Sequence, residues 1–336
     1  MTKLPVFVGL DYHQASVQVC VMDAAGKIIA NRKCPNDWRL VAAVAGDSEQ
    51  VCAAIEACGG AADLADELVE QAGWSVDLAH PGYVHRIKQS PDKTDYSDAQ
   101  LLADLERVGY LPRVWHAPQR IRELRRLVRY RQQLSAEHRS VKLRIRALLR
   151  DHRLTLTDAT AWTKAWLAWV AHGARLPEQS RWIMDQHLSQ LEHLKERMQA
   201  VEGRLAELAQ QDRLIGELLK IPGVGLITAV TIRAEIGRFD RFRNGKQLSR
   251  FCGLSPRNAS SGQRQADAGL IKAGNAELRR VLTQAAHRLM RYEPRWQQIA
   301  CQLKQRGKPI PLIVAAVANR WMRTLYHQLE GYGLAA

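Results

Sequence analysis

Four acidic residues have the types and the placement that a metal-binding site needs. They are Asp11, Glu56, Asp95 and Asp98. The first two each end an apolar run, 6–10 and 51–55, so we expect both carboxylates where a buried strand reaches the surface. Carboxylates at neighbouring strand ends can share one site. Several of them together repel one another unless a cation lies between them, so the arrangement implies a metal ion.

The second pair of acids is expected at the start of a helix. Thr94 can cap a helix whose early turn presents Asp95 and Asp98, three residues apart, on one face. Taken alone, two acids there could simply be charges that the helix dipole stabilises. Together with the two strand-end acids they fit phosphoryl transfer, in which two Mg²⁺ ions about 4 Å apart polarise the attacking and leaving oxygens. Hard oxygen ligands favour Mg²⁺ over zinc.

The elements that must position these acids alternate between strand and helix. Strands are predicted at 6–10, 17–22, 28–32, 51–56 and 76–78, with a hairpin turn at 24–27. Helical patterns at 61–71 and 96–109 imply crossover connections and parallel neighbours. Three antiparallel strands followed by parallel additions is the ribonuclease-H-like order, so the predicted fold of this region is α/β.

The character of the chain changes at about residue 120. Twelve Lys and Arg face three acids over 120–153, with apolar residues every seven positions, which predicts a long basic amphipathic helix. A second heptad pattern over 191–208 could pair with it as an antiparallel coiled coil, with tryptophans 162, 166, 169 and 182 packing at the tip. The basic face is either a solvated surface or a contact with nucleic acid or another subunit.

A glycine-rich turn separates two further helices, predicted at 215–219 and 227–236. The turn, 221–225, resembles that of a helix-hairpin-helix, in which Gly223 and Gly225 would let backbone N–H groups approach a phosphate. The alternative is an ordinary tight turn. Basic residues that follow the turn favour the phosphate interpretation. They include Arg257 and Arg264.

Composition limits the partners. The chain has 336 residues, and 49 Lys and Arg against 34 Asp and Glu give a net charge of +15, which attracts polyphosphates. Its hydrophobic content of 46% excludes wholesale disorder. No C-x-x-C pair occurs among six cysteines, which favours a reducing cytoplasm. We expect neither secretion nor membrane insertion, because a charged leader and an apolar stretch of roughly 20 residues are both missing.

Several short motifs, in order along nearly the whole chain, resemble the insertion sequence 110 family of transposases and the related Piv-type DNA invertases. They are Gly-Leu-Asp11, Ile-Glu56-Ala, Lys-Thr-Asp95-x-x-Asp98-Ala, the Ile-Pro-Gly-Val-Gly turn at 221–225, Phe-Cys-Gly-Leu-Ser-Pro-Arg at 251–257, Ser261-Gly262, and the segment 272–280. The match departs slightly after Glu56, where Ala-Cys-Gly-Gly replaces Ala-Thr-Gly.

The resemblance implies a composite active site. A RuvC-like DEDD domain would bind Mg²⁺ through its four acids, and Ser261 would attack DNA to give a phosphoserine-linked intermediate. Such a covalent link conserves the phosphodiester energy for rejoining. Many members of the family are programmed by a bridge RNA from their own element. Ser260 precedes Ser261, and the family serine directly precedes glycine, which favours Ser261. Arg257 or Lys272 could stabilise charge on the phosphate.

The resulting hypothesis is a three-part DNA recombinase: a RuvC-like domain at 1–116, a basic helical region at 117–211, and a mainly α-helical transposase domain at 212–336. It would act as a dimer or tetramer, associated with the nucleoid when active, in which acids of one subunit can combine with the serine of another. Two alternatives stay open. A RuvC-like nuclease or junction resolvase would need only the acids, and a catalytically idle nucleic-acid-binding protein would need neither acids nor serine.

Overall fold

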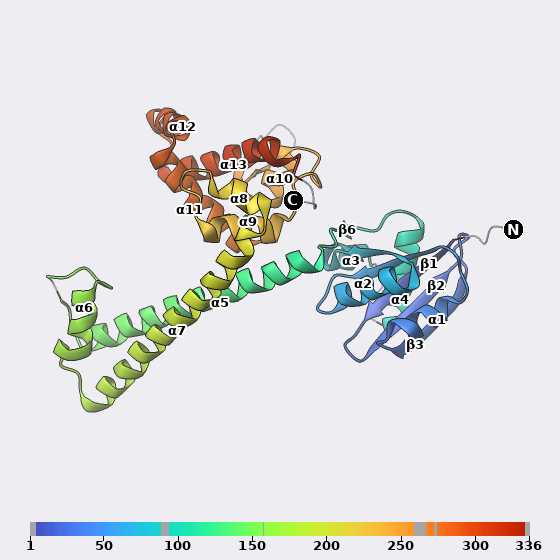
Figure 1. The fold of residues 1–336 in the computed structure, drawn as a ribbon, viewed down its shortest axis with the longest axis horizontal. Helices are drawn as coiled ribbons and strands as arrows, with labels where there is room; N and C mark the ends of the chain where they lie inside the picture. Colours follow the sequence, from blue (N-terminus) through green and yellow to red (C-terminus); the bar gives the residue numbers. More distant parts are fainter. Residues whose placement is uncertain (1–4, 89–93, 157, 259–266, 272–273, 333–336) are drawn as a thin grey trace. The chain divides into compact units, whose positions relative to one another are not determined.

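The computed structural model describes residues 5–88, 94–156, 158–258, 267–271 and 274–332. The chain divides into two compact units, Met1–Ala117 and Pro118–Ala336 (Figure 1). The first is a mixed α/β unit, and the second is almost entirely helical. The predicted boundary at 211 between a helical region and a transposase domain falls inside the second unit.

A six-stranded sheet forms the centre of the first unit, in the order β3-β2-β1-β4-β5-β6. The strands are β1 Val6–Tyr12, β2 Ser16–Met22, β3 Ile28–Pro35, β4 Val51–Glu56, β5 Ser75–Ala79 and β6 Arg113–Val114. The first three are antiparallel, whereas β4 is parallel to β1 and β5 to β4. The predicted strand order is therefore confirmed. The short antiparallel β6 at the edge was not predicted.

Helices cover both faces of this sheet. On one face, α1 (Trp38–Ala45) and α2 (Ala61–Ala72) bury Val41 and Leu68 against strand residues such as Val8 and Leu10. On the other face, α4 (Asp95–Arg107) packs on β1 and β2. The two predicted helices, α2 and α4, are confirmed. The sequence prediction missed α1 and α3 (Pro81–Ile87).

Two long helices open the second unit, α5 (Gln119–Asp151) and α7 (Glu178–Gln210). They pack antiparallel: Arg131 in the first half of α5 contacts Glu202 in the second half of α7, with Nη2 and Oε1 2.7 Å apart. At the other end of the pair, His152 Nε2 and Ser180 Oγ are 2.9 Å apart. Both long helices and their antiparallel pairing agree with the prediction from the heptad patterns.

Aromatic residues gather around α6 (Lys164–Ala168) and the π-helical turn η1 (Trp169–Gly173) that connect the long helices. The rings of Trp162 and Trp166 lie 4.6 Å apart, and Lys142 of α5 lies over Trp162. Three of the four predicted tryptophans thus pack here, including Trp169. Trp182 was expected to pack with them, but its side chain is 62% exposed.

The remaining helices of the second unit surround α9, whose residues from Thr228 to Ile236 are all buried. These elements are α8 Arg213–Leu219, α9 Leu226–Ile236, α10 Gly245–Phe251, α11 Ala276–Tyr292, α12 Pro294–Gln305 and α13 Ile310–Leu329, with the strands β7 Pro256–Asn258 and β8 Asp267–Leu270. The two helices predicted on either side of the glycine turn are confirmed as α8 and α9. Among the described helices, none combines the length and the apolar character needed to cross a membrane.

Candidate metal site and its place in the family

Asp11 and Glu56 lie at the same end of two neighbouring parallel strands. The β1–β4 register pairs Leu10 with Ile55, so the two acids follow one position further along. Alternation along the strands places both on the face that α4 covers, because Gly9 of β1 and Ala54 of β4 contact that helix. The sheet therefore brings the two strand-end acids side by side, as the sequence predicted.

The close approach of α4 to β1 depends on a residue without a side chain. A Cβ atom on Gly9 would overlap the carbonyl oxygen of Ala99 and lie 2.5 Å from the amide nitrogen of Ala103. Thr94 caps the helix by accepting a hydrogen bond from Ser97 N at 3.1 Å. Small residues and a cap thus place the first turn of α4, with its two acids, beside the end of β1.

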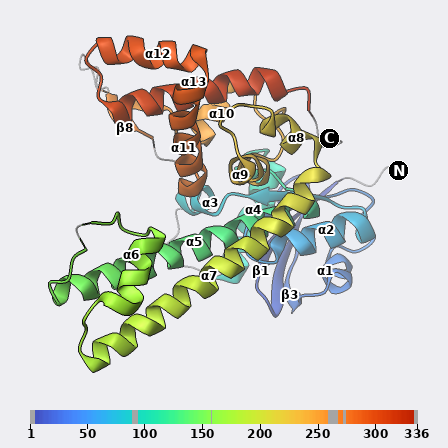
Figure 2. The ribbon, with the colours of Figure 1, turned by 60° about the vertical axis from the view of Figure 1, so that its left-hand side comes forward.

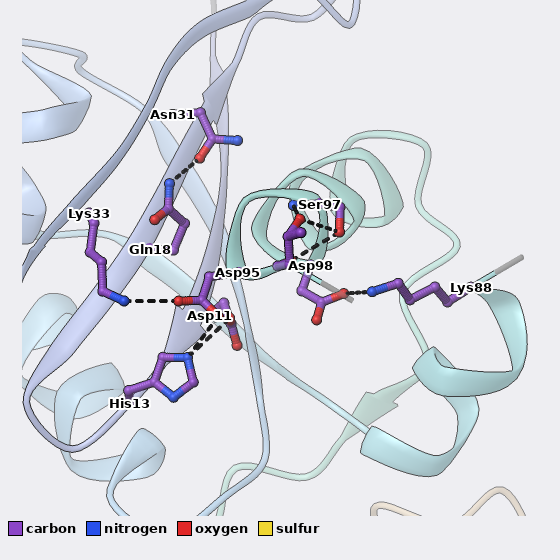
Figure 3. A network of polar contacts seen from close by, with 10 residues as sticks. Asp11, His13, Gln18, Asn31, Lys33, Lys88, Asp95, Ser97 and Asp98 are labelled. Atoms are coloured by element: carbon purple, nitrogen blue, oxygen red, sulfur yellow. Dashed lines mark hydrogen bonds and ion pairs between the residues drawn. The ribbon is translucent and has the colours of Figure 1, made fainter. Parts of the chain in front are cut away.

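His13 connects the first acid to the third (Figure 3). Its Nε2 atom lies 3.4 Å from Asp11 Oδ2 and 3.3 Å from Asp95 Oδ1. Lys33 of β3 donates a hydrogen bond to the other carboxylate oxygen of Asp95 at 2.9 Å. A strand end, the residue just beyond it, and a helix start therefore converge at one point.

The surroundings of Asp11 raise the pKa of its carboxyl group, whereas those of Asp95 lower it. Burial raises the pKa of Asp11; His13 opposes this, while the negative charges of Asp95 and Asp98 add to it. The hydrogen bond from Lys33 lowers the pKa of Asp95, and the imidazole of His13 contributes in the same direction. A carboxylate held among like charges is the kind of group that a bound cation stabilises.

Asp98 and Glu56 lie close to this pair but outside the closest cluster. Asp98 forms an ion pair with Lys88, just beyond α3, and Figure 3 shows its carboxylate turned toward that lysine. Glu56 is near enough to Asp11 for both charges to help raise the pKa of Cys58, after the larger effect of burial. The four predicted acids thus belong to one end of the sheet, and the direct contacts centre on Asp11 and Asp95.

The donor set fits a divalent cation. Asp11, His13 and Asp95 each offer one ligand atom, and these atoms all lie within 4.8 Å of one another. Two carboxylates and one imidazole are ligands that several divalent metals accept. Lys33 and Lys88 now supply the positive charge beside Asp95 and Asp98. The role of all four acids as ligands stays a prediction.

Sequence reasoning missed His13, Lys33 and Lys88. The spacing Asp-x-His at the end of a predicted strand was the available signal for His13, because alternate residues share a face. The two lysines carried no signal. They reach the acids from β3 and from the end of α3, and only the folded topology brings those segments to the site.

The glycine turn has a structural explanation of its own. Gly223 adopts φ +84°, and a Cβ atom there would lie 2.9 Å from Cβ of Arg288 on α11. Gly225 precedes α9 as its N-cap residue, with ordinary φ −92°. Backbone geometry and packing account for Gly223 without a ligand. Its binding to phosphate, and that of Gly225, stay predictions.

The serine segment connects β7 to β8. Arg257 lies on β7 with an exposed side chain. Ser260, Ser261, Arg264 and Lys272 lie outside the described residues. The antiparallel pairing of Pro256 with Leu270 brings together the two strands that flank the serines in the sequence.

An acidic cluster at the end of a sheet is a candidate metal site, and a net charge of +15 favours a protein of the nucleic-acid-binding class. Comparison with known families agrees. Residues 8–153 match the DEDD domain of IS110 transposases, and residues 216–300 match the transposase family IS116/IS110/IS902. The chain belongs to the IS110 family of transposases.

Curated relatives are similar over most of the chain. A probable family 20 transposase of Pseudomonas aeruginosa is 31% identical, over 82% of this chain and 83% of its own length. The transposase of insertion sequence element IS1111A from Coxiella burnetii is 27% identical, over 84% and 78%. The transposase of element IS1328 from Yersinia enterocolitica is 27% identical, over 69% of each chain. Family membership implies an enzyme that cuts and rejoins DNA.

Proposed function

We propose that this transposase exchanges donor and target DNA strands through a covalent phosphoserine intermediate at Ser261. Asp11, Glu56, Asp95 and Asp98 would hold Mg²⁺ during the reaction. The cluster of Asp11, His13 and Asp95 carries the proposal, because their ligand atoms lie within 4.8 Å of one another at the end of β1. The fold is consistent with it too, since three antiparallel strands are followed by parallel ones, as expected for a ribonuclease-H-like sheet.

In the proposed reaction, Ser261 Oγ attacks a phosphorus atom of the DNA backbone. An Oγ–P bond forms as one P–O bond to the neighbouring deoxyribose breaks. Ser261 Oγ gives up its proton, and the released sugar oxygen takes one up. Attack by the hydroxyl end of a second strand then reverses the process on a new partner and returns serine to its free form. The phosphodiester energy is conserved, whereas attack by water would discard it.

The acids would contribute by holding the cation and the DNA in a fixed relation. A bound Mg²⁺ would supply polarisation of the phosphate oxygens and neutralise charge that develops on them. Asp11 is suited to a ligand role by its half-buried position among like charges. His13 and Lys33 would keep Asp95 oriented between turnovers.

Target choice would lie mainly in a bridge RNA that pairs with donor and target DNA, as pairing does in other guided systems. The net charge of +15 and the basic helix α5 supply surface for two kinds of nucleic acid. Because strand exchange joins four DNA ends, the active form would be a dimer or tetramer. The α5–α7 pair offers an extended surface for that contact.

A protein–DNA adduct on a denaturing gel tests the mechanism. The protein is expressed with its native flanking DNA, and wild type is compared with Ser261→Ala, Ser260→Ala and Asp11→Ala. We expect the adduct to disappear with Ser261→Ala and Asp11→Ala and to persist with Ser260→Ala. Removal of divalent cations should abolish it as well.

Free nicked DNA without any adduct, unaffected by Ser261→Ala, would replace this proposal with a nuclease that uses water as the nucleophile. An adduct that persists in Ser261→Ala and vanishes in Ser260→Ala would move the nucleophile by one residue. Thermal unfolding of each variant, matched to wild type, ensures that a missing adduct reflects chemistry.

A further inference from the structure

Three adjoining cavities follow one face of α13 in the second unit. Leu312, Ala316, Arg320, Arg323 and His327 line them, at steps of three or four residues that place them on one side of the helix. The opposite side of α13 is buried against α10 and α11, and α12 lies beside it (Figure 2). From residue 312 to 327 the open face is about 22 Å long at 1.5 Å per residue.

This face is basic. Arg320, Arg323 and Lys308 are exposed, and none forms an ion pair with a residue in the described part of the chain. Arg295 of α12 and Lys246 of α10 add positive charge along the same face. Within the described ranges, the linings of the three cavities contain no acid. Unpaired arginines in a row are suited to successive phosphates.

One end of the face opens into a mainly apolar cavity of about 480 Å³. Leu254, Pro256 and Leu270 line it from the β7–β8 side, and Leu312 and Ala316 line it from α13. Its volume lies within the range of small-ligand sites, roughly 300–1,000 Å³. The cavity therefore has room for a flat apolar group such as a nucleobase, directly beside the cationic row.

The cavity also contacts the two strands that flank the proposed nucleophile in the sequence. Pro256 and Leu270 pair with each other across the hairpin, and they lie five and nine positions from Ser261 in the sequence. Asn319 of α13 contacts the segment that precedes β7. It donates hydrogen bonds to Ser249 Oγ at 2.7 Å and to the Leu254 carbonyl at 3.1 Å. A strand bound along α13 would thus reach β7 and β8, which lie on either side of Ser261 in the sequence.

We propose that this face of α13 binds single-stranded DNA, with phosphates on Arg320 and Arg323 and one unpaired base in the apolar cavity. An unpaired base can enter a cavity, whereas the bases of an intact duplex cannot. The choice of DNA over RNA rests on the proposed function, because a serine that attacks DNA needs a DNA strand positioned at its hairpin. The face would hold that strand open beside β7 and β8, the two strands between which Ser261 lies in the sequence.

Fluorescence anisotropy with the full-length protein and a labelled oligothymidine tests the binding of phosphates. The double variant Arg320→Gln/Arg323→Gln should bind about tenfold more weakly, and the slope of its salt dependence should fall by about 0.7 for each phosphate that the variant no longer binds. The control Lys195→Gln/Arg204→Gln removes the same charge from α7, where both cations already pair with acids. The control should bind as wild type does.

An oligonucleotide of the same length that lacks bases tests the cavity. Wild type should prefer the oligothymidine to this abasic strand. The ratio of the two affinities should fall toward one in Ala316→Leu, because the larger side chain fills the cavity. Leu312→Ser offers a second variant that removes apolar lining from a side chain 53% exposed, where folding is little affected.

Equal binding by wild type and the Arg320→Gln/Arg323→Gln variant would overturn the proposal, as would tighter binding of oligouridine RNA than of DNA. If both cavity variants still preferred the oligothymidine to the abasic strand as strongly as wild type does, the cavity would not be part of the binding site. Ser261→Ala separates this inference from the serine mechanism, because that variant should bind the oligothymidine normally while forming no adduct. If wild type forms no adduct either, binding along α13 can still be measured, and only its link to the serine is refuted.

Discussion

The absent side chain of Gly9 sets the distance between α4 and the sheet. With any Cβ atom at this position the helix backbone at Ala99 and Ala103 would have to shift. Such a shift would carry Asp95 away from Asp11, because Asp95 is the first residue of the same helix. Gly9 therefore constrains the candidate metal site without being one of its possible ligands.

Gly9→Ala should lower the free energy of unfolding of the protein by about 3 kcal/mol, since overpacking against backbone cannot be relieved by a side-chain rotation. Denaturant unfolding measures this. Gly59→Ala is the matched control in the same unit, because a Cβ atom there has nothing within 4 Å. It should change stability by less than about 0.5 kcal/mol. A Gly9→Ala protein as stable as the control would show that α4 can move away from β1 at little cost.

At the scale of residues, the sequence predicted where the acids lie better than it predicted which side chains contact them. Asp11 and Glu56 could be placed because an apolar run that ends in an acid has one simple structural meaning. His13 could not, since a histidine just beyond a strand end has many possible environments. Lys33 and Lys88 could not either, because their proximity to Asp95 and Asp98 depends on how the chain returns to the site from β3 and α3.

At the scale of elements, the carboxylate of Asp212, between α7 and α8, makes two different hydrogen bonds. Asp212 caps α8 by accepting a hydrogen bond from Ile215 N at 3.1 Å through Oδ1. Its other oxygen accepts from Arg233 Nε at 2.7 Å, and Arg233 is fully buried in α9. A buried guanidinium without its carboxylate is costly, so this pair holds α8 and α9 together.

Asp212→Asn keeps the helix cap and removes the charge. It should lower the free energy of unfolding by about 3 kcal/mol because it removes the negative charge of the carboxylate that accepts a hydrogen bond from the buried Arg233. Asp212→Ala should lower it by about 1 kcal/mol more, because the cap is removed as well. Denaturant unfolding resolves the two contributions.

Asp240→Asn provides the comparison, because the Arg238–Asp240 pair is about one-third exposed on each side. A surface pair of this kind contributes about 1 kcal/mol or less. If Asp212→Asn proved no more harmful than Asp240→Asn, the buried pair would not be what fastens α8 to α9.

Elements with a long periodic pattern were predictable, whereas the short elements α1, α3 and β6 were missed. The heptads of α5 and α7 repeat over several turns, so their apolar stripes indicate both length and partner. The eight residues of α1 and the seven of α3 are too short for a period to be recognised. The two residues of β6 pair with β5 only because the chain passes that edge on its way to α5.

At the scale of the whole molecule, the acids and the serine belong to different compact units of the chain. A catalytic site that uses both can be assembled within one subunit or between two. Mixed oligomers distinguish these two arrangements, because one inactive variant can supply what the other lacks.

Asp11→Ala and Ser261→Ala should each form no adduct alone, and yet regain it when the two proteins are mixed and allowed to exchange subunits. With random exchange half of the dimers are mixed. In each of these, one of two sites joins intact acids of one subunit to the intact serine of the other, so adduct should return to about one quarter of the wild-type level. Quantifying the adduct on a denaturing gel measures that recovery.

A mixture of Asp11→Ala with Asp95→Ala is the control, since both variants damage the acidic site and should stay inactive together. If the first mixture also stays inactive although subunits exchange, acids and serine must act within one chain.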